Sequence, residues 1–387
     1  MTSDDTLALL QLIAAGGPAA PRRDLLDAFG SPAAAMAAGR ARWREAGLTP
    51  QQAQALRAPD DAGLEAARLW CSGPNHRVVG WTDADYPATL RRTSNPPLAL
   101  FVAGDVDLLW YPAVAIVGSR AATPAGLDNA AAFARVIAGS GLAVASGMAA
   151  GIDTAAHAAA LAVEGGRTLA VLGTGPDIAY PRSNAVLHGR IVRSGAVVTE
   201  HLPGTLPRPE HFPSRNRILA GLALGTVVIE AAERSGALIT ARLAADAGRE
   251  VFAVPGSIHN PLARGCHRLI RDGAALVEDA SELITALAPQ ARQLAEDLRE
   301  RLGTPIPVSP PPPSDRSGRA PAPPFRSGAA NDHDYQTLWG ALGHDPTGMD
   351  QLVERTGLTP AMVSSMLLLM ELDGRVATQH GRYYRTG

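Results

Sequence analysis

The fold is decided by Val114-Ala-Ile-Val-Gly-Ser-Arg-Ala-Ala-Thr-Pro124, an apolar run that ends in glycine and serine and leads to a threonine and a proline. Such a run is typical of a buried strand with a sharp turn at its end. Thr123 is a good N-cap and Pro124 is favoured at the first helical position, so a helix is expected to begin there. The stretch predicts a strand, a glycine loop and a helix, the repeating unit of a parallel α/β sheet.

The same unit recurs between about 77 and 285. The predicted strands are short apolar runs, each followed by sequence long enough for a helix: Val114–Val117, Leu142–Ala145, Thr168–Leu172, Ala196–Thr199, Thr226–Glu230 and Val251–Val254. This pattern predicts an α/β, Rossmann-like core with a mostly parallel sheet that is buried on both faces. Ligands of such folds bind beyond the carboxyl ends of the strands.

Two smaller domains are expected around this core, which is assigned to 71–287. Residues 1–70 contain short helical patterns with glycine and proline turns, similar to a SAM-like or helix-hairpin-helix domain. Residues 288–330 are rich in proline and predict a stiff linker. Residues 331–387 show three helical patterns and then a hairpin, the order of a winged helix. The expected recognition helix has no basic residue, which favours contact with protein over contact with DNA.

Composition limits the classes of function. The chain has 387 residues, a formal net charge of -2 and no lysine, so all 35 cations are arginines. A P-loop lysine and a Schiff-base lysine are therefore excluded. Any nucleic-acid site has to be a local arginine patch, and arginine suits phosphate because its planar fork donates two hydrogen bonds. Aromatic residues make up 4%, so a base-stacking platform would be small.

Cysteine usage and hydropathy point to the cytoplasm. Cys71 and Cys266 are far apart and lack partner ligands at metal spacing, so neither a disulfide nor a zinc site is expected. No metal or cofactor is predicted. The acidic start Met1–Asp5 does not resemble a signal peptide, and no run of about 18 apolar residues predicts a membrane span.

The first two predicted strand ends carry candidate phosphate contacts. Gly118, Ser119 and Arg120 follow the first strand, where free N–H groups at the helix start and a mobile guanidinium favour an anion. The second strand leads into Ala145-Ser-Gly-Met-Ala-Ala-Gly-Ile-Asp-Thr-Ala-Ala-His157. In it, Ser146, Gly147 and Gly151 let the backbone approach a phosphate, and Asp153 can cap the helix. His157 is interpreted as a packing residue rather than a base.

Two later segments add to the candidate site. In His211-Phe-Pro-Ser-Arg-Asn-Arg-Ile-Leu-Ala220, an aromatic residue stands before an Arg-Asn-Arg triplet at a predicted helix start. Phe212 can stack on a base, and Arg215 and Arg217, with Asn216 between them, can meet phosphates. Ser235-Gly236 follows another strand and supplies a turn before a helix that faces the same crevice.

In this order across about 110–277, these segments resemble the DNA-processing protein (DprA/Smf) family. The resemblance implies a non-enzymatic homodimer that binds and protects single-stranded DNA and loads a RecA-type recombinase in natural transformation, on DNA shielded by single-strand-binding protein. It also implies that Gly118-Ser-Arg120 forms the family's phosphate pocket and that Arg215-Asn-Arg217 is its Arg-Asn-Arg segment. The chain departs from the family in lacking lysines along the DNA path and in having Cys266-His267 where many members carry asparagine.

Two enzyme classes are the alternatives. An NAD-dependent dehydrogenase is disfavoured because Gly118 has no second glycine two residues on, and Ile178 stands where Gly173-Thr-Gly175 would need a third. A nucleotide-cleaving enzyme of the lysine-decarboxylase-like group shares the sheet type and could use Glu230 as a catalytic carboxylate. That group's Pro-Gly-Gly turn is missing, however, and fold alone does not decide between enzyme and binder.

Overall fold

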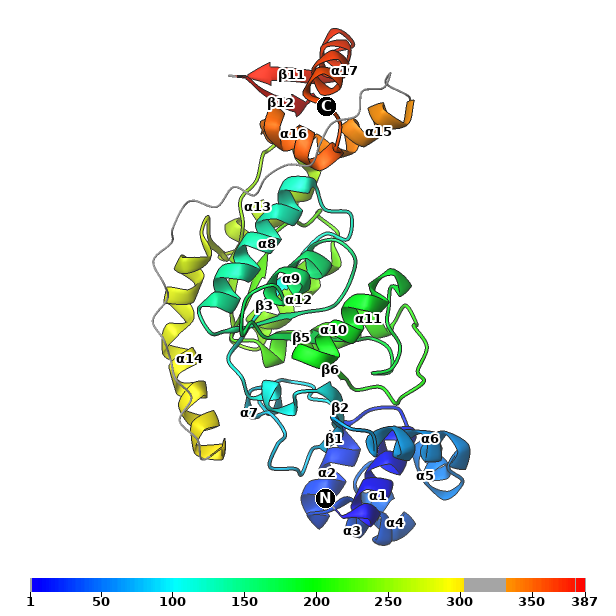
Figure 1. The fold of residues 1–387 in the computed structure, drawn as a ribbon. Helices are drawn as coiled ribbons and strands as arrows, with labels where there is room; N and C mark the ends of the chain where they lie inside the picture. Colours follow the sequence, from blue (N-terminus) through cyan, green and yellow to red (C-terminus); the bar gives the residue numbers. More distant parts are fainter. Residues whose placement is uncertain (1, 303–331, 380, 387) are drawn as a thin grey trace.

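The computed structural model describes residues 2–302, 332–379 and 381–386. A nine-stranded sheet with the order β1-β2-β6-β5-β4-β3-β7-β8-β9 lies in the middle of the molecule (Figure 1). Its strands are β1 (His76–Gly80), β2 (Ala99–Gly104), β3 (Ala113–Val117), β4 (Ala143–Ser146), β5 (Thr168–Val171), β6 (Ala196–Thr199), β7 (Gly225–Val228), β8 (Glu250–Ala253) and β9 (Ala275–Leu276).

All six strands predicted from the sequence are present, with ends that differ by at most two residues. From β3 to β9 the neighbouring pairs are parallel, as predicted. β1, β2 and β9 were not predicted; β1 and β2 pair antiparallel with each other, and β2 pairs antiparallel with β6. No helix separates β1 from β2 except one turn, α7 (Ala88–Arg91), so the strand-and-helix pattern that revealed the other strands does not extend to them.

Helices cover both faces of the sheet, which explains why its strands are uninterrupted apolar runs. One face is covered by α8 (Pro124–Gly139), α9 (Ile152–Ala160), α10 (Ala185–Ser194) and α14 (Ala280–Leu302). The other is covered by α7, α11 (His211–Leu222), α12 (Gly236–Asp246) and α13 (Arg264–Arg271). The chain runs from β3 outward to β6 and then returns to β7 beside β3. The strand order therefore reverses between β3 and β7, where α/β sheets bind ligands.

The first helices form a unit with its own core: α1 (Ser3–Ala14), α2 (Ala20–Phe29), α3 (Pro32–Ala37), α4 (Gly39–Glu45), α5 (Pro50–Arg57) and α6 (Asp61–Cys71). A second cluster joins this unit to the sheet, because Leu9 and Leu10 of α1 pack with Val78 of β1 and Phe101 of β2. The helical unit thus lies against the antiparallel end of the sheet (Figure 1).

The C-terminal residues form the predicted winged helix. Its elements are α15 (Asp332–Ala341), β10 (Thr347–Gly348), α16 (Met349–Thr356), α17 (Pro360–Leu372), β11 (Val376–Gln379) and β12 (Arg382–Arg385), around one small core. The short strand β10, which pairs with β12, was not predicted. Arg355 of α16 forms an ion pair with Asp128 of α8, so the winged helix rests against the start of that helix (Figure 1).

The predicted linker at 288–330 begins too early, because α14 continues to Leu302. Leu287, Leu294 and Leu298 recur at helical spacing and are buried, and α14 packs along α8. This burial outweighs the signal of Pro289, which lies inside the helix. The proline-rich remainder, 303–330, lies outside the described residues.

Candidate nucleic-acid interface

A cavity of about 570 Å³ opens at the carboxyl ends of the parallel strands, next to the point where the strand order reverses. Nine of the twelve site residues predicted from the sequence contribute to its wall: Gly118, Ser119, Arg120, Gly147, Phe212, Arg215, Asn216, Ser235 and Gly236. They come from loops that are up to 118 positions apart in the chain, and the sheet brings them together. Ser146, Gly151 and Arg217 do not line it.

Arg120 is the exposed cation at one side of this cavity. Its guanidinium carbon lies 5.9 Å from the centre of the Phe212 ring, within the range of a cation–π contact. In the part of the chain that the structure describes, no ion pair engages Arg120. Below it, Ser119 is buried and its hydroxyl accepts a hydrogen bond from the Ala121 amide at 3.2 Å. The loop is thus fixed while the arginine side chain stays available to an anion.

Gly118 directly follows β3 at a position that has no space for a side chain. A Cβ at this position would lie 2.6 Å from Ile152 and 2.9 Å from the carbonyl oxygen of Glu230. The backbone passes between α9 and the end of β7 with no space for a side chain. Any larger residue would push the Arg120 loop away from the cavity.

Two aromatic rings line the cavity next to Arg120. Phe212, in the first turn of α11, lies 4.9 Å from Tyr180, and the ring planes are tilted by 36°. Tyr180 is 40% exposed and lines the cavity. Tyr180 was not predicted as a site residue, although an aromatic residue shortly after the strand-end glycines Gly173 and Gly175 was a usable signal. Together the rings provide a small stacking surface beside Arg120.

A second exposed arginine, Arg234, was also missed. It lies in the loop after β7, lines the cavity and immediately precedes Ser235. The Ser235 hydroxyl accepts a hydrogen bond from the Ala237 amide at 3.2 Å and so caps α12, whose first residues face the cavity. The Glu-Arg-Ser-Gly order placed this arginine at the same strand end as the predicted serine and glycine.

Arg215 was expected to contact a phosphate, but in the structure its guanidinium is buried and bonded to the backbone of the sheet. It is 5% exposed, and one guanidinium nitrogen donates hydrogen bonds to the carbonyl oxygens of Gly147, at 2.6 Å, and Val171. Burial lowers the pKa of Arg215 to about 10, and the nearby Asp153 carboxylate opposes this decrease. The guanidinium therefore stays charged while it ties α11 to the ends of β4 and β5. The triplet alone gave no indication that this arginine faces the sheet.

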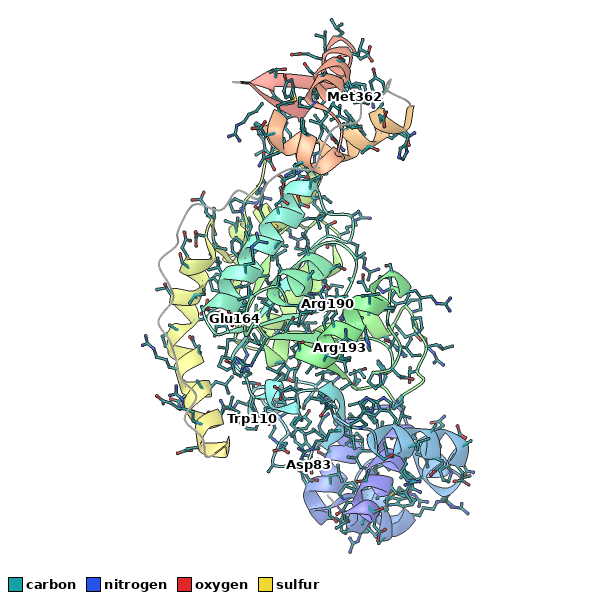
Figure 2. All side chains as sticks on the ribbon, in the orientation of Figure 1. Asp83, Trp110, Glu164, Arg190, Arg193 and Met362 are labelled. Atoms are coloured by element: carbon teal, nitrogen blue, oxygen red, sulfur yellow. The ribbon has the colours of Figure 1, made fainter. Side chains whose placement is uncertain are left out.

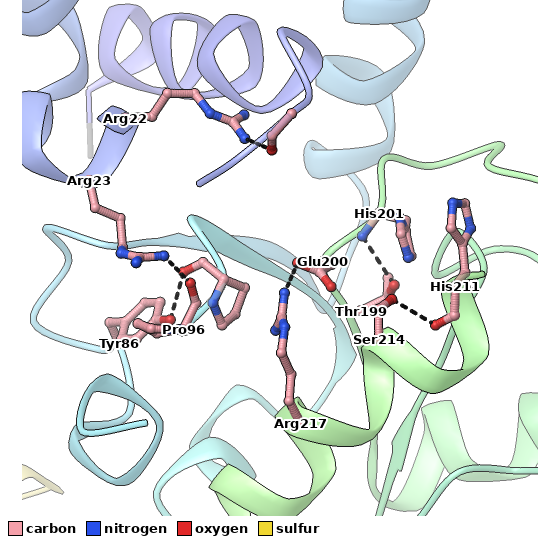
Figure 3. A network of polar contacts seen from close by, with 12 residues as sticks. Arg22, Arg23, Tyr86, Pro96, Thr199, Glu200, His201, His211, Ser214 and Arg217 are labelled. Atoms are coloured by element: carbon pink, nitrogen blue, oxygen red, sulfur yellow. Dashed lines mark hydrogen bonds and ion pairs between the residues drawn. The ribbon is translucent and has the colours of Figure 1, made fainter. Parts of the chain in front are cut away.

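Arg217 likewise points away from the cavity. Its Nη2 lies 2.5 Å from Oε2 of Glu200, at the end of β6, and both side chains are largely buried. Figure 3 shows the pair between α11 and the N-terminal helices, near Arg23 and Tyr86. The structure does not bring Arg217 to the cavity with Arg215, because residues two apart on a helix face different directions. Only Asn216 and the buried Arg215 of this triplet reach the cavity wall.

Ser146 and Gly151 hold loops together instead of lining the cavity. The buried Ser146 hydroxyl donates to the carbonyl oxygen of Ile116 at 2.6 Å. Gly151 has a φ of +76°, and a Cβ there would overlap the carbonyl oxygen of Ser119. Asp153 does not cap α9 as expected; it accepts hydrogen bonds from the amides of Gly147 and Ala149, at 3.1 and 3.2 Å. These contacts lock the β4–α9 loop beneath the Arg120 loop.

Glu230 occupies the helix start at which a phosphate was expected. The Thr123 amide donates to one of its carboxylate oxygens at 2.9 Å, and the Thr123 hydroxyl and the Asn260 amide group donate to the other at 2.7 and 3.0 Å. The Thr123 hydroxyl in turn caps α8 by accepting from Gly126. The amides of Thr123 and Gly126 at the start of α8 are therefore satisfied within the protein. With 6% of its surface exposed, Glu230 is also a poor catalytic carboxylate, which weakens the nucleotide-cleaving alternative.

A pair of histidines fixes the start of α11 and hence Phe212. The rings of His201 and His211 stack at 4.0 Å, and Nδ1 of His211 lies 3.1 Å from the carbonyl oxygen of Gly173 (Figure 3). Burial lowers the pKa of His201 to about 4, and the nearby His211 and Arg217 add to this decrease. At neutral pH the His201 ring is uncharged, so the stack avoids like-charge repulsion.

His157 is a packing residue, as predicted. It is fully buried, and its Nδ1 lies 2.7 Å from the Thr168 hydroxyl. Burial lowers its pKa to about 3, with a smaller contribution from Arg215, so the ring is neutral at physiological pH. The two cysteines are free thiols, as predicted. In residues 2–302, 332–379 and 381–386, no helix has the length and apolar character needed to cross a bilayer.

The winged helix presents a different surface. The outer face of α17 carries no basic side chain, and its exposed large residues are Leu368, Leu369 and Leu372. This face also carries the exposed acidic residue Glu371, so it is largely apolar and lacks the cations that duplex DNA binding requires. Contact with a protein through α17 remains a prediction.

Two family models match the chain, one over the α/β core and one over the winged helix. A family model described as DNA recombination-mediator protein A matches residues 77–288, and one described as the DprA winged helix domain matches 319–382. The chain is 36% identical over 343 residues to Protein Smf of Escherichia coli K12, and the match covers 88% of this chain and 86% of that relative. It is 48% identical over 204 residues to the DNA processing protein DprA of Streptococcus pneumoniae R6, and this match covers 52% of this chain and 71% of that relative.

A solved structure shares the fold. The X-ray structure of DNA processing protein A from Streptococcus pneumoniae has a TM-score of 0.64 and 35% sequence identity, and the likeness covers 72% of this chain and 97% of that chain. All residues that line the cavity fall between 117 and 240, within the range matched by the first family model.

Proposed function

The chain belongs to the DNA-processing (DprA/Smf) family and so has a DNA-processing role in recombination, and from this premise we propose that its strand-end cavity binds single-stranded DNA. The observation that carries the proposal is the placement of exposed Arg120 against Phe212, with Tyr180 beside it. A cation next to stacking rings matches a phosphate followed by its unpaired base.

The size and charge of the cavity support a single strand over a duplex. A space of about 570 Å³ is of the size that takes one small ligand group. The bases of a duplex are already stacked on one another and would have to be opened to reach Phe212. Arg120 and Arg234 can neutralise backbone phosphates on either side of a base.

We further propose that the protein acts without a catalytic step and without a cofactor. It would bind as a homodimer in the cytoplasm, protect incoming DNA and load a RecA-type recombinase during natural transformation, on strands that single-strand-binding protein has covered. The family membership and the engaged state of Glu230 support this role.

A binding titration tests the proposal. Fluorescence anisotropy with a labelled oligothymidylate, and with a blunt duplex of equal length, is measured at two salt concentrations. We expect tighter binding of the single strand and an affinity that falls with salt, because each neutralised phosphate releases counterions. Equal affinity for the two DNAs, or no dependence on salt, would overturn the proposal.

A further inference from the structure

One face of α10 carries arginines that lie outside the cavity. We infer that this face, formed by Val186, Arg190 and Arg193 of α10 and by Arg182 of the short 3-10 helix η2 (Arg182–Asn184) that leads into it, binds the phosphates of a single strand after it leaves the cavity; we name it the α10 track. The inference rests on the proposed function and extends its site along the molecule.

The local charge of this segment is strongly positive. From Ile178 to Thr199 there is no acidic residue, whereas the segment contains three arginines. The whole chain, by contrast, has 37 acidic residues and 35 arginines. Arg182, Arg190 and Arg193 are all exposed, and no ion pair between residues of the described ranges involves them. Cations without a carboxylate partner are available to an anionic ligand.

The spacing of these residues puts them on one side of the helix. Positions 186, 190 and 193 of α10 are separated by four and three residues, which is the spacing of neighbours on a helical surface, and Arg182 lies in η2 directly before α10. The buried residues Leu187 and Ile191 lie on the opposite side, against the sheet. At about 1.5 Å per residue, the track is about 16 Å long.

The track starts at the cavity. Tyr180 lines the cavity, and Arg182 follows it by two residues. Buried Asn184 then donates hydrogen bonds to the Met148 carbonyl at 3.0 Å and to the Thr154 hydroxyl at 2.9 Å. These bonds fasten the start of α10 beneath the loop that supplies Gly147 to the cavity wall. Figure 2 labels Arg190 and Arg193 farther along the same helix.

The side chains of the track suit a single strand. Val186 is 77% exposed and stands between Arg182 and Arg190, so an apolar surface alternates with cations. A single strand offers both phosphates and unstacked bases to such a surface, whereas the outside of a duplex offers phosphates and sugars. Continuity with the cavity favours the strand over an acidic protein as the occupant.

The test compares two oligonucleotide lengths. The double variant Arg190→Ala, Arg193→Ala is titrated with oligothymidylates of about 5 and about 16 nucleotides, near the two ends of the usual range of site sizes. We expect an unchanged affinity for the short strand and a loss of about three- to tenfold for the long strand. The log–log salt slope for the long strand should become shallower by about 1.4, since each phosphate contact of a single strand contributes about 0.7.

A matched control removes the same charge elsewhere. Arg135 of α8 and Arg292 of α14 are exposed helical arginines outside the cavity, so Arg135→Ala, Arg292→Ala should leave both affinities and the slope unchanged. Thermal melts establish that both variants are folded. If the control shows the same loss, a general electrostatic field and not the track attracts the strand, and the inference fails.

The remaining outcomes separate the two proposals. Equal losses for the short and the long strand would move these arginines into the cavity site and refute a separate track. Unchanged affinity for both strands would also refute it, and would point to an acidic protein as the ligand of this face. If the wild-type protein binds neither oligonucleotide, the proposed function fails and the track fails with it.

Discussion

The strand-end cavity and helix α17 of the winged helix are both surfaces of a kind that binds nucleic acid in other proteins, yet they present opposite chemistry. The cavity combines Arg120 and Arg234 with two aromatic rings at the point where the sheet order reverses. The outer face of α17 offers leucines and no cation. DNA affinity depends on cations that neutralise the phosphates. Of these two surfaces, the cavity has such cations and the outer face of α17 has none. The comparison teaches that the side chains, and not the fold that carries them, determine the ligand.

The largest expected effect comes from Arg120→Ala. The change would remove the proposed charge-assisted contact with a phosphate, which is worth about 1.5–3 kcal/mol, so single-strand affinity should fall about ten- to hundredfold. The melting temperature should barely move, because the side chain is exposed. Anisotropy titrations and thermal melts measure the two quantities. Near-normal binding by the folded variant would show that the cavity is not the DNA site.

Phe212→Ala should give the next largest effect. Loss of one base-stacking contact typically costs about 1–3 kcal/mol, and we expect about a tenfold decrease in affinity here. Tyr180→Ala should act in the same direction but more weakly, because Phe212 remains as a stacking surface. Phe212→Tyr keeps the ring and serves as the control. If Phe212→Tyr is as weak as Phe212→Ala, stacking is not the contact that matters.

Sequence patterns predicted the scaffold and the meeting point of the loops better than the roles of single side chains. Strand alternation with glycine loops identified β3 to β8 and the edge at which Arg120, Phe212 and Gly236 converge. The orientation of Arg215 and Arg217 could not be predicted, because it depends on carbonyl groups and a carboxylate from β4, β5 and β6. Such long-range partners leave no trace in the local sequence.

Arg217→Ala separates stability from binding at the cavity edge. The variant leaves the largely buried Glu200 carboxylate without its partner, which should lower the free energy of unfolding by about 1–3 kcal/mol. Single-strand affinity of the folded protein should change little, since Arg217 does not line the cavity. Urea unfolding and titration at low temperature provide the readouts. A loss of affinity as large as that of Arg120→Ala would restore Arg217 to the DNA site.

Deletion of residues 331–387 should have the smallest effect on DNA. Single-strand affinity and its salt dependence are expected to stay unchanged, because the winged helix contributes no residue to the cavity. The double substitution Leu368→Glu, Leu372→Glu in the full chain tests whether the exposed leucines of α17 contact a protein. It should weaken binding of a protein partner in a pull-down with a RecA-type recombinase and leave DNA binding intact. A large fall in DNA affinity on deletion would contradict the assignment of α17 to protein contact.

The carboxylate at the start of α8 has a consequence for how this sequence can evolve. Thr123, Glu230 and Asn260 are far apart in the chain but share one set of hydrogen bonds, in which each depends on the others. A change at Glu230 removes the acceptor of both Thr123 and Asn260, and a change at either donor removes part of the set that pairs Glu230, so the cost of one change depends on the other residues. These three positions should therefore show epistasis and covary among relatives. Arg120, which bonds to none of them, should be free of that constraint and held only by its ligand.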